Sequence, residues 1–233
     1  MRDIVEMGYT VVEDILDAMA VERLIEVTAE LASSGRGGAR NLLDCAEIRA
    51  LAASRILRDL VEPVLGCECF AVRALYFDKT PESNWKVPWH QDLVIAVRER
   101  MDDAAGYGAW SVKAGVPHVE PPVQVLTQML AVRIHLDDCG VENGPLRMKP
   151  GSHRLGRLTG SERIDGDASC CVRRGGAILM RPLLLHASSA AESPGHRRVI
   201  HIEYAVDELP GGVQWRDRVA ERDAIYLSPQ ARR

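Results

Sequence analysis

The amino-acid sequence predicts a mainly β protein of the jelly-roll type, a sandwich or barrel, whose core is supported by N-terminal helices. Beyond residue 66 the apolar residues recur with the two-residue period of strands, in eight runs separated by turns rich in Gly, Pro, Asn and Asp. The helical pattern is confined to the part before that point, so helices and strands do not alternate as a parallel α/β sheet requires. These two observations favour an antiparallel β core.

Residues 1–66 are expected to form a helical buttress. Two stretches there carry apolar residues near the 3.6-residue period of a helix, and they are 15–31 and 48–60. The first helix is expected to end at 33–35, and the second to begin at a capping box of Asp44 and Glu47. Amphipathic helices gain most of their stability from what they pack on, so both are expected to cover the β core.

The β core is predicted to extend over residues 67–206. In chain order its strand-like runs are 69–77, 93–97, 123–136, 146–149, 168–173, 177–180, 183–187 and 199–206. One connection, at about 100–122, is long for a compact domain, and its aromatic residues favour an ordered lid over a disordered insertion. Because no repeat, linker or low-complexity tract appears, we expect a single domain over residues 1–233, with 207–233 as a C-terminal extension.

Composition excludes several classes of function. The 233 residues are 46% apolar and 27% charged with a net charge of -4, which is typical of a soluble globular protein without a basic surface for nucleic acid. No apolar run is long enough to cross a membrane, and the first residues do not resemble a secretory signal. The six cysteines lack metal-ribbon or redox spacing, and the vicinal pair Cys170-Cys171 is typical of a reducing compartment, so a cytoplasmic protein is expected.

The motif Trp89-His90-Gln91-Asp92 is the first candidate for chemistry. It opens the predicted strand 93–97, and residues two apart on a strand share a face, so His90 and Asp92 are expected to point at the same place with Gln91 turned away. Two histidines and one carboxylate form the facial triad that holds non-heme Fe(II) and leaves coordination positions open. A second histidine must therefore come from elsewhere in the chain.

A second candidate lies near the C-terminal end of the core. The runs 183–187 and 198–206 are predicted to pair as a hairpin around the turn at 192–195. If the reversal centres on 193–194, His186, Ser188, Arg197 and His201 lie on one face, which leaves both histidines open as the third ligand. Arg197 suits a carboxylate, because its planar fork can bind both oxygens.

These motifs resemble a known family. Three features carry the resemblance: Trp89-His90-Gln91-Asp92, the stretches Asp137-Asp138, Glu142-Asn143-Gly144-Pro145 and Pro150-Gly151-Ser152-His153, and the pair His186 and Arg197. Together, over roughly Gly8 to Val206, they resemble the phytanoyl-CoA dioxygenase family of Fe(II)- and 2-oxoglutarate-dependent oxygenases. The resemblance implies a double-stranded β-helix core and the use of Fe(II), 2-oxoglutarate and O2.

The same resemblance implies roles for individual residues. His90, Asp92 and His186 match the metal ligands, which favours His186 over His201 as the third. Arg197 matches the residue that holds the distal carboxylate of 2-oxoglutarate, and Ser188 sits where some members place a hydroxyl against it. Because Asp92 is retained, where related halogenases have a small residue, hydroxylation of a small organic metabolite with release of succinate and CO2 is favoured.

Other residues carry weaker expectations. Arg73 and Arg133 are mid-strand charges, which are rare unless paired or lining a cavity, so both are candidates for the substrate or co-substrate pocket together with Trp110. They favour an anionic or polar small-molecule substrate. Trp89 is expected in the core, His153 is expected to stabilise a turn, and His118, His135 and His196 have no supporting neighbours in the sequence. The alternative function is a non-catalytic or cupin-like jelly-roll module, or an isomerase, that keeps a metal or sugar site without oxygen chemistry.

Overall fold

The computed structural model describes residues 2–32, 37–160, 162–192 and 195–221. The chain divides into two compact units, each built from three segments. The first unit takes residues 1–39, 75–92 and 131–201, and the second takes 40–74, 93–130 and 202–233. The predicted helix end at 33–35, the turn residues 193–194 and most of the predicted C-terminal extension lie outside the described residues.

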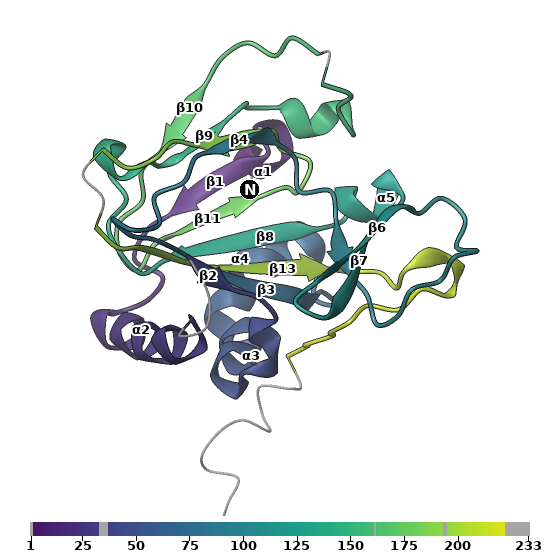
Figure 1. Ribbon diagram of the computed structural model, residues 1–233, viewed down its shortest axis with the longest axis horizontal. Coiled ribbons are helices and arrows are strands. Elements are labelled where there is room, and N and C mark those ends of the chain that lie inside the picture. The colour runs from purple at the N-terminus through teal and green to yellow at the C-terminus, as the bar shows by residue number, and fades with distance from the viewer. Residues whose placement is uncertain (1, 33–36, 161, 193–194, 222–233) are drawn as a thin grey trace, which may run out of the picture. The chain divides into compact units, whose positions relative to one another are not determined.

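The first unit contains two β-sheets. One has the strand order β1-β11-β8-β13-β3-β2 and the other β10-β9-β12-β4, and Figure 1 shows them as two layers. The strands are β1 (Tyr9–Val12), β2 (Gly38–Ala39), β3 (Phe70–Lys79), β4 (Val87–His90), β8 (Leu130–His135), β9 (Leu146–Met148), β10 (Ala168–Cys170), β11 (Ala177–Met180), β12 (His186–Ser188) and β13 (Arg197–Ala205). Helices α1 (Arg2–Glu6) and α2 (Ala18–Ala32) and the 3-10 turns η2 (Val141–Asn143) and η3 (Ser152–Leu155) complete the unit. Strands β3, β8 and β13 also contribute residues to the second unit.

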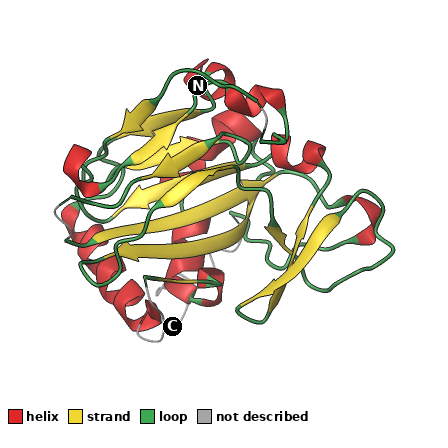
Figure 2. Ribbon diagram, turned by 45° about the horizontal axis from the view of Figure 1, so that its top comes forward, coloured by secondary structure: helices red, strands yellow, loops and turns green. Residues whose placement is uncertain are grey.

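The apolar core of the first unit lies between its two sheets. Ala131 of β8 and Ile178 and Met180 of β11 belong to one buried cluster with Leu146 and Met148 of β9. These residues alternate along their strands, so the intervening residues face outward. Two antiparallel sheets that bury their inner faces against each other form a jelly roll, which confirms the predicted fold class. Figure 2, in which strands are yellow, shows the mainly β character.

The second unit combines a small sheet with helices. Its three strands follow the order β5-β7-β6. Its elements are η1 (Leu42–Asp44), α3 (Ala46–Ala53), α4 (Arg55–Leu65), β5 (Ile95–Ala96), β6 (Gly108–Lys113), β7 (Val116–Glu120), α5 (Val123–Thr127) and η4 (Pro210–Gly212). Helix α3 is tied to the end of β13 by the Tyr204 hydroxyl, which donates to the carbonyl of Ala52 over 2.9 Å, and α4 buries Leu57 and Val61 completely.

The second predicted helix differs from the structure at its start and in its middle. The N-cap of α3 is Cys45, without a side-chain cap bond, and Asp44 instead accepts hydrogen bonds from Arg216 at 2.8 Å. The capping-box prediction was therefore wrong. The helix also breaks at Ser54, whose hydroxyl accepts from the backbone N–H of Leu57 and so starts α4 as a separate helix.

The first part of one predicted strand run and one predicted strand pairing were also wrong. The run 123–136 contains α5 before β8, because the short apolar stretch after Pro121-Pro122 suits a helix start as well as a strand. The predicted hairpin of 183–187 with 198–206 does not form: β12 pairs with β9 and β4, and β13 lies in the other sheet.

The long connection at 100–122 is ordered. It contains the hairpin of β6 and β7, with Gly115 in the left-handed conformation at its tip, φ 76°. Its action as a lid stays a prediction, as does the single domain. Among the described residues, no helix is both long and apolar enough to span a bilayer.

Candidate metal centre and buried cations

His90, Asp92 and His186 come together in the first unit. His90 is the last residue of β4 and His186 the first of β12, and the two lie directly opposite each other in the antiparallel pair. Their ring centroids are 4.2 Å apart, and the Asp92 carboxylate places Oδ1 3.7 Å from His90 Nε2 and Oδ2 3.7 Å from His186 Nε2. One ligand atom from each residue fits within 4.8 Å of the others, so the three could hold one metal ion.

The route to this geometry differs from the sequence argument. We expected His90 and Asp92 to share the face of one strand, but β4 ends at His90 and Asp92 stands in the loop before β5. The hydrogen bond from the Asp92 backbone N–H to the carbonyl of Pro182, at 2.9 Å, holds that loop beside the segment that leads into β12. Pairing across strands, and not spacing along one strand, brings the carboxylate to both imidazoles.

Both histidines present Nε2 to the carboxylate for the same local reason. The Nδ1–H of His186 donates to the carbonyl of Leu184 over 2.8 Å, and that of His90 to the carbonyl of Pro88 over 2.9 Å. A carbonyl can only accept, so each Nδ1 carries the proton and each Nε2 keeps its lone pair. Burial lowers the pKa of His186 to about 4, which keeps the ring neutral, the form that binds a metal.

Gln91 fixes the loop between the two ligands. Its amide nitrogen donates to the carbonyls of Gly156 and Leu183, at 2.8 and 2.6 Å, and its oxygen accepts from the N–H of Leu158 at 2.8 Å. Gln91 does turn away from the ligands, as expected, but it has a structural role that the sequence analysis missed. It joins the segment that carries His90 and Asp92 to the segment that precedes His186.

The triad is closed on one side and open on the other. The side chain of His186 is 4% exposed, whereas those of His90 and Asp92 are 36% and 26% exposed. A small molecule can therefore approach past His90 and Asp92 but not past His186. An ion held here would keep coordination positions toward solvent.

Three buried cations lie in the same unit. Lys79 of β3, Arg133 of β8 and Arg197 of β13 are 1%, 8% and 4% exposed. The charges of Arg197 and Arg133 lower the pKa of Lys79, after burial itself, and Arg133 is within electrostatic reach of Asp92. No ion pair joins any of the three to a carboxylate among the described residues. An unneutralised buried charge costs several kcal/mol unless a ligand compensates it.

Several buried polar side-chain atoms of Arg133, Arg197 and His135 also have no partner. The buried Nε atoms of Arg133 and Arg197 and both ring nitrogens of His135 make no hydrogen bond within the described chain. His135 lies two residues from Arg133 on β8 and so shares its face, and burial together with Arg133 and Arg197 lowers its pKa to about 3. Buried polar atoms are almost always satisfied, so these mark the place of a ligand rich in acceptor oxygens.

Ser188 contacts the cation cluster formed by Lys79, Arg133 and Arg197. Its Oγ accepts a hydrogen bond from Lys79 Nζ at 3.1 Å, and the same ammonium donates to the carbonyl of Ser189 at 2.6 Å. Arg197 donates through Nη1 to the carbonyl of Gly144. Lys79 was missed in the sequence analysis, and His135 was set aside there. Each is the last residue of its strand, so the mid-strand rule that singled out Arg133 does not cover them.

The remaining predicted residues lie elsewhere or serve the fold. Arg73, in the second unit, forms a buried two-pronged ion pair with Glu203. Trp110 lies on β6, and the guanidinium carbon of Arg100 lies 5.9 Å from the centre of the Trp110 ring. His201 is outside the triad and meets Arg133 Nη1 at 3.2 Å through its Nδ1. Trp89 is only half-buried, between the cations of Arg147 and Lys149, so its core prediction was wrong.

The minor histidines also have identifiable surroundings. His153 lies in η3 and its Nε2 meets the carbonyl of Val5 at 3.2 Å, consistent with a turn-stabilising role. His196, which has no supporting neighbour in the sequence, has one in space, because its Nδ1 lies 2.9 Å from Asp78. His118 of β7 is buried near Arg73, Lys113 and Arg40, which together with burial lower its pKa.

Comparison with known proteins decides the family. Residues 4–199 match the model of the phytanoyl-CoA dioxygenase (PhyH) family, which is most of the chain. The chain belongs to the phytanoyl-CoA dioxygenase family. The resemblance drawn from the sequence motifs is thereby confirmed. No curated protein matches the chain.

Solved structures with the same fold support this placement. The α-ketoglutarate-dependent epimerase SnoN from nogalamycin biosynthesis is 19% identical with a TM-score of 0.66, over 91% of this chain and 88% of its own. EctD from S. alaskensis with bound Fe is 21% identical, TM-score 0.67, over 89% and 76%. HygX from Streptomyces hygroscopicus, with nickel and 2-oxoglutarate bound, is 17% identical, TM-score 0.63, over 87% and 84%. At these identities the likeness shows a shared fold.

Proposed function

We propose that this member of the phytanoyl-CoA dioxygenase family is an Fe(II)- and 2-oxoglutarate-dependent oxygenase. It oxidises a small organic molecule with O2, by hydroxylation, and releases succinate and CO2. The observation that carries the proposal is the coincidence, in one unit, of a two-histidine, one-carboxylate group with buried cations that have no counter-ion. The first suits non-heme iron, and the second suits a dicarboxylate.

The donor set fits both groups. His90, Asp92 and His186 would hold Fe(II), because both histidines are fixed with Nε2 unprotonated and the carboxylate lies between them. Arg197 and Ser188 would hold the distal carboxylate of 2-oxoglutarate, and Arg133, within electrostatic reach of Asp92, would supply a further positive charge for the co-substrate. Iron with bound 2-oxoglutarate supplies the activation of O2 and the oxidative decarboxylation of the keto acid.

The chain's own residues supply orientation and protection from water. His186, which is buried, closes one side of the triad to solvent, whereas the partly exposed His90 and Asp92 leave an approach for a substrate. No side chain is needed as a general base, so none is proposed. Arg73 and Trp110 stay predictions for the substrate pocket, and Arg73 already has the partner Glu203.

Hydroxylation is the finer part of the proposal. Asp92 occupies the carboxylate position, which favours hydroxylation over halogenation. The neighbour SnoN is described as an epimerase, so this fold also serves other oxidations. The rival function, a jelly-roll module that binds a metal or a sugar without oxygen chemistry, gives no role to the unneutralised cations.

An anaerobic titration tests the proposal. Addition of 2-oxoglutarate to the Fe(II)-loaded protein is expected to produce a weak visible charge-transfer band, which His186→Ala abolishes. His196→Ala is the matched control, because this exposed histidine lies outside the triad and should leave the band unchanged. If the wild-type protein binds iron but shows no band and no succinate at saturating 2-oxoglutarate, the oxygenase proposal is wrong and the binding-module function is favoured.

A further inference from the structure

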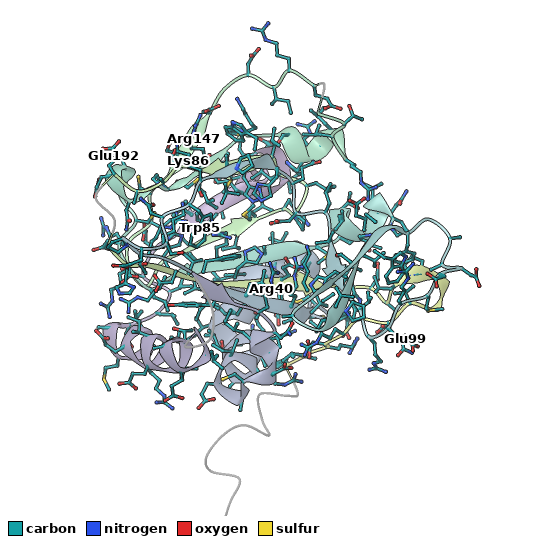
Figure 3. All side chains as sticks on the ribbon, viewed as in Figure 1. Arg40, Trp85, Lys86, Glu99, Arg147 and Glu192 are labelled. Carbon is teal, nitrogen blue, oxygen red and sulfur yellow. The ribbon has the colours of Figure 1, made fainter. Side chains whose placement is uncertain are left out.

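Lys79 has more donors than the protein uses. An ammonium has three N–H bonds, and two of them go to the Ser188 hydroxyl and the Ser189 carbonyl. The third has no acceptor among the described residues, and the ring centre of Trp85, which Figure 3 labels, lies 5.7 Å from Nζ. A cation–π contact at this distance offsets only part of the cost of burying a charge.

A purely structural role does not explain why residue 79 is a buried cation. Two neutral acceptors could be satisfied by a neutral donor, without a third buried cation beside Arg133 and Arg197. By comparison, the buried Arg58 of the second unit is matched by Glu62 at 2.6 Å and by the carbonyls of Cys67 and Cys69. Lys79 has no such carboxylate within the described chain.

Ser188 connects Lys79 to the co-substrate. Its oxygen accepts from Lys79, so its own hydroxyl proton is free to donate to a further acceptor. The donor Ser188 thus has its orientation set by a positive charge, and charge-assisted hydrogen bonds are about twice as strong as neutral ones. Arg197, the proposed anchor, is within electrostatic reach of the same ammonium.

We propose that Lys79 is a second cationic anchor for the distal carboxylate of 2-oxoglutarate, acting beside Arg197 and partly through the hydroxyl of Ser188. The inference rests on the proposed function. It assigns to one lysine the selection of a keto acid with a second carboxylate over one without it. The carboxylate supplies the counter-charge that Lys79 lacks in the protein alone.

The test compares two keto acids on the anaerobic Fe(II) protein. 2-Oxoglutarate and 2-oxopentanoate chelate a metal in the same way, but only the first has a distal carboxylate. Lys79→Met is expected to weaken 2-oxoglutarate binding tenfold or more, because a hydrogen bond to a charged group is lost, and to leave 2-oxopentanoate binding unchanged. Lys86→Met is the matched control, since Lys86 is exposed in the same unit (Figure 3). Dissociation constants come from the charge-transfer band.

Two further variants keep the proposal falsifiable. Lys79→Gln retains a donor and removes the charge, and serves should Lys79→Met not fold. Ser188→Ala is expected to weaken 2-oxoglutarate as well, and in the double variant with Lys79→Met the losses should be less than additive, because the two side chains act as a pair. If the losses of 2-oxoglutarate affinity are additive, Lys79 does not act through the hydroxyl of Ser188.

The outcomes separate this proposal from the function on which it rests. If Lys79→Met and Lys79→Gln weaken both keto acids and iron equally, Lys79 only positions β12, and the anchor is disproved while the oxygenase stands. The same holds if 2-oxoglutarate affinity does not change. If the wild-type protein binds neither keto acid, the proposed function fails and the anchor fails with it.

Discussion

Arg73 and Arg133 occupy the same kind of place, the middle of a long buried strand, yet their surroundings differ. Arg73 on β3, in the second unit, forms a two-pronged ion pair with Glu203. Arg133 on β8, in the first unit, contacts the ring of Phe77 and the nitrogen of His201, and its Nε has no partner within the described chain. A cation that stabilises the fold has its counter-ion in the protein, whereas one that binds a ligand does not.

The same difference extends beyond this pair. In the second unit Arg58 also meets a carboxylate, Glu62, whereas in the first unit Lys79 and Arg197 resemble Arg133 in having none among the described residues. The free-energy cost of burying these three charges is therefore not compensated within the first unit until an anion binds. Stability, affinity and pH dependence should each respond differently to changes in the two groups.

The largest expected effect is on stability in the second unit. Glu203→Gln removes the carboxylate charge from a buried ion pair with Arg73, which should lower the free energy of unfolding by about 3–5 kcal/mol. Urea denaturation followed by circular dichroism measures it. Glu208→Gln is the control, because Glu208 is 71% exposed in its pair with Arg218 and should change stability by less than about 1 kcal/mol. A loss no larger than that of the control would remove the distinction between the two groups.

The reverse pattern is expected for Arg197→Met in the first unit. Loss of the hydrogen bond to Gly144 is offset by relief of repulsion with Lys79, so stability without ligand should change by no more than about 1 kcal/mol. The affinity for 2-oxoglutarate should fall roughly 100-fold, because a two-pronged charge-assisted contact is lost. Denaturation and the anaerobic titration measure the two quantities. Strong destabilisation without loss of affinity would make Arg197 a structural cation like Arg73.

A smaller effect is expected at Gln91, which contacts no ligand atom of the triad. Gln91→Ala removes three hydrogen bonds that hold the loop with His90 and Asp92, so the affinity for Fe(II) should fall roughly tenfold. Competition with a chelator measures it, and the exposed Gln124→Ala is the control. Unchanged iron affinity would show that strand pairing between His90 and His186 suffices to build the site.

The sequence predicted the triad better than the strands that carry it. The motif around His90 and the spacing of His186 from Arg197 identified the residues, but the predicted hairpin would have placed His186 opposite His201 instead of opposite His90. A short apolar run does not specify its partner strand, so the sequence could not show that β12 and β13 lie in different sheets. Which of two histidines completes the group was decided by strand pairing.

The cation cluster was harder to predict for a different reason. Whether Arg73 and Arg133 line a cavity depends on whether a carboxylate lies opposite, and Glu203 is 130 residues from Arg73 in the chain. Lys79 stands at the end of β3, and its meaning comes from Ser188, which lies on another sheet. Both pairs join residues that are far apart in the chain, so no short stretch of sequence could reveal them.

The smallest effect expected is that of pH, and it sharpens the contrast in the first unit. Burial, followed by the charges of Arg197 and Arg133, lowers the pKa of Lys79 to about 8. A bound carboxylate favours the charged ammonium and so raises the pKa of Lys79. Binding of 2-oxoglutarate should therefore be strongest below pH 8. Above pH 8 its affinity should fall by at most about tenfold per pH unit. Titrations of the wild-type protein with 2-oxoglutarate between about pH 7 and 9.5 should show this decline, and Lys79→Met should be flat. A decline of equal slope in the variant would assign the titration to another group. A flat profile in the wild-type protein would mean that Lys79 stays charged over this pH range or does not contact the carboxylate.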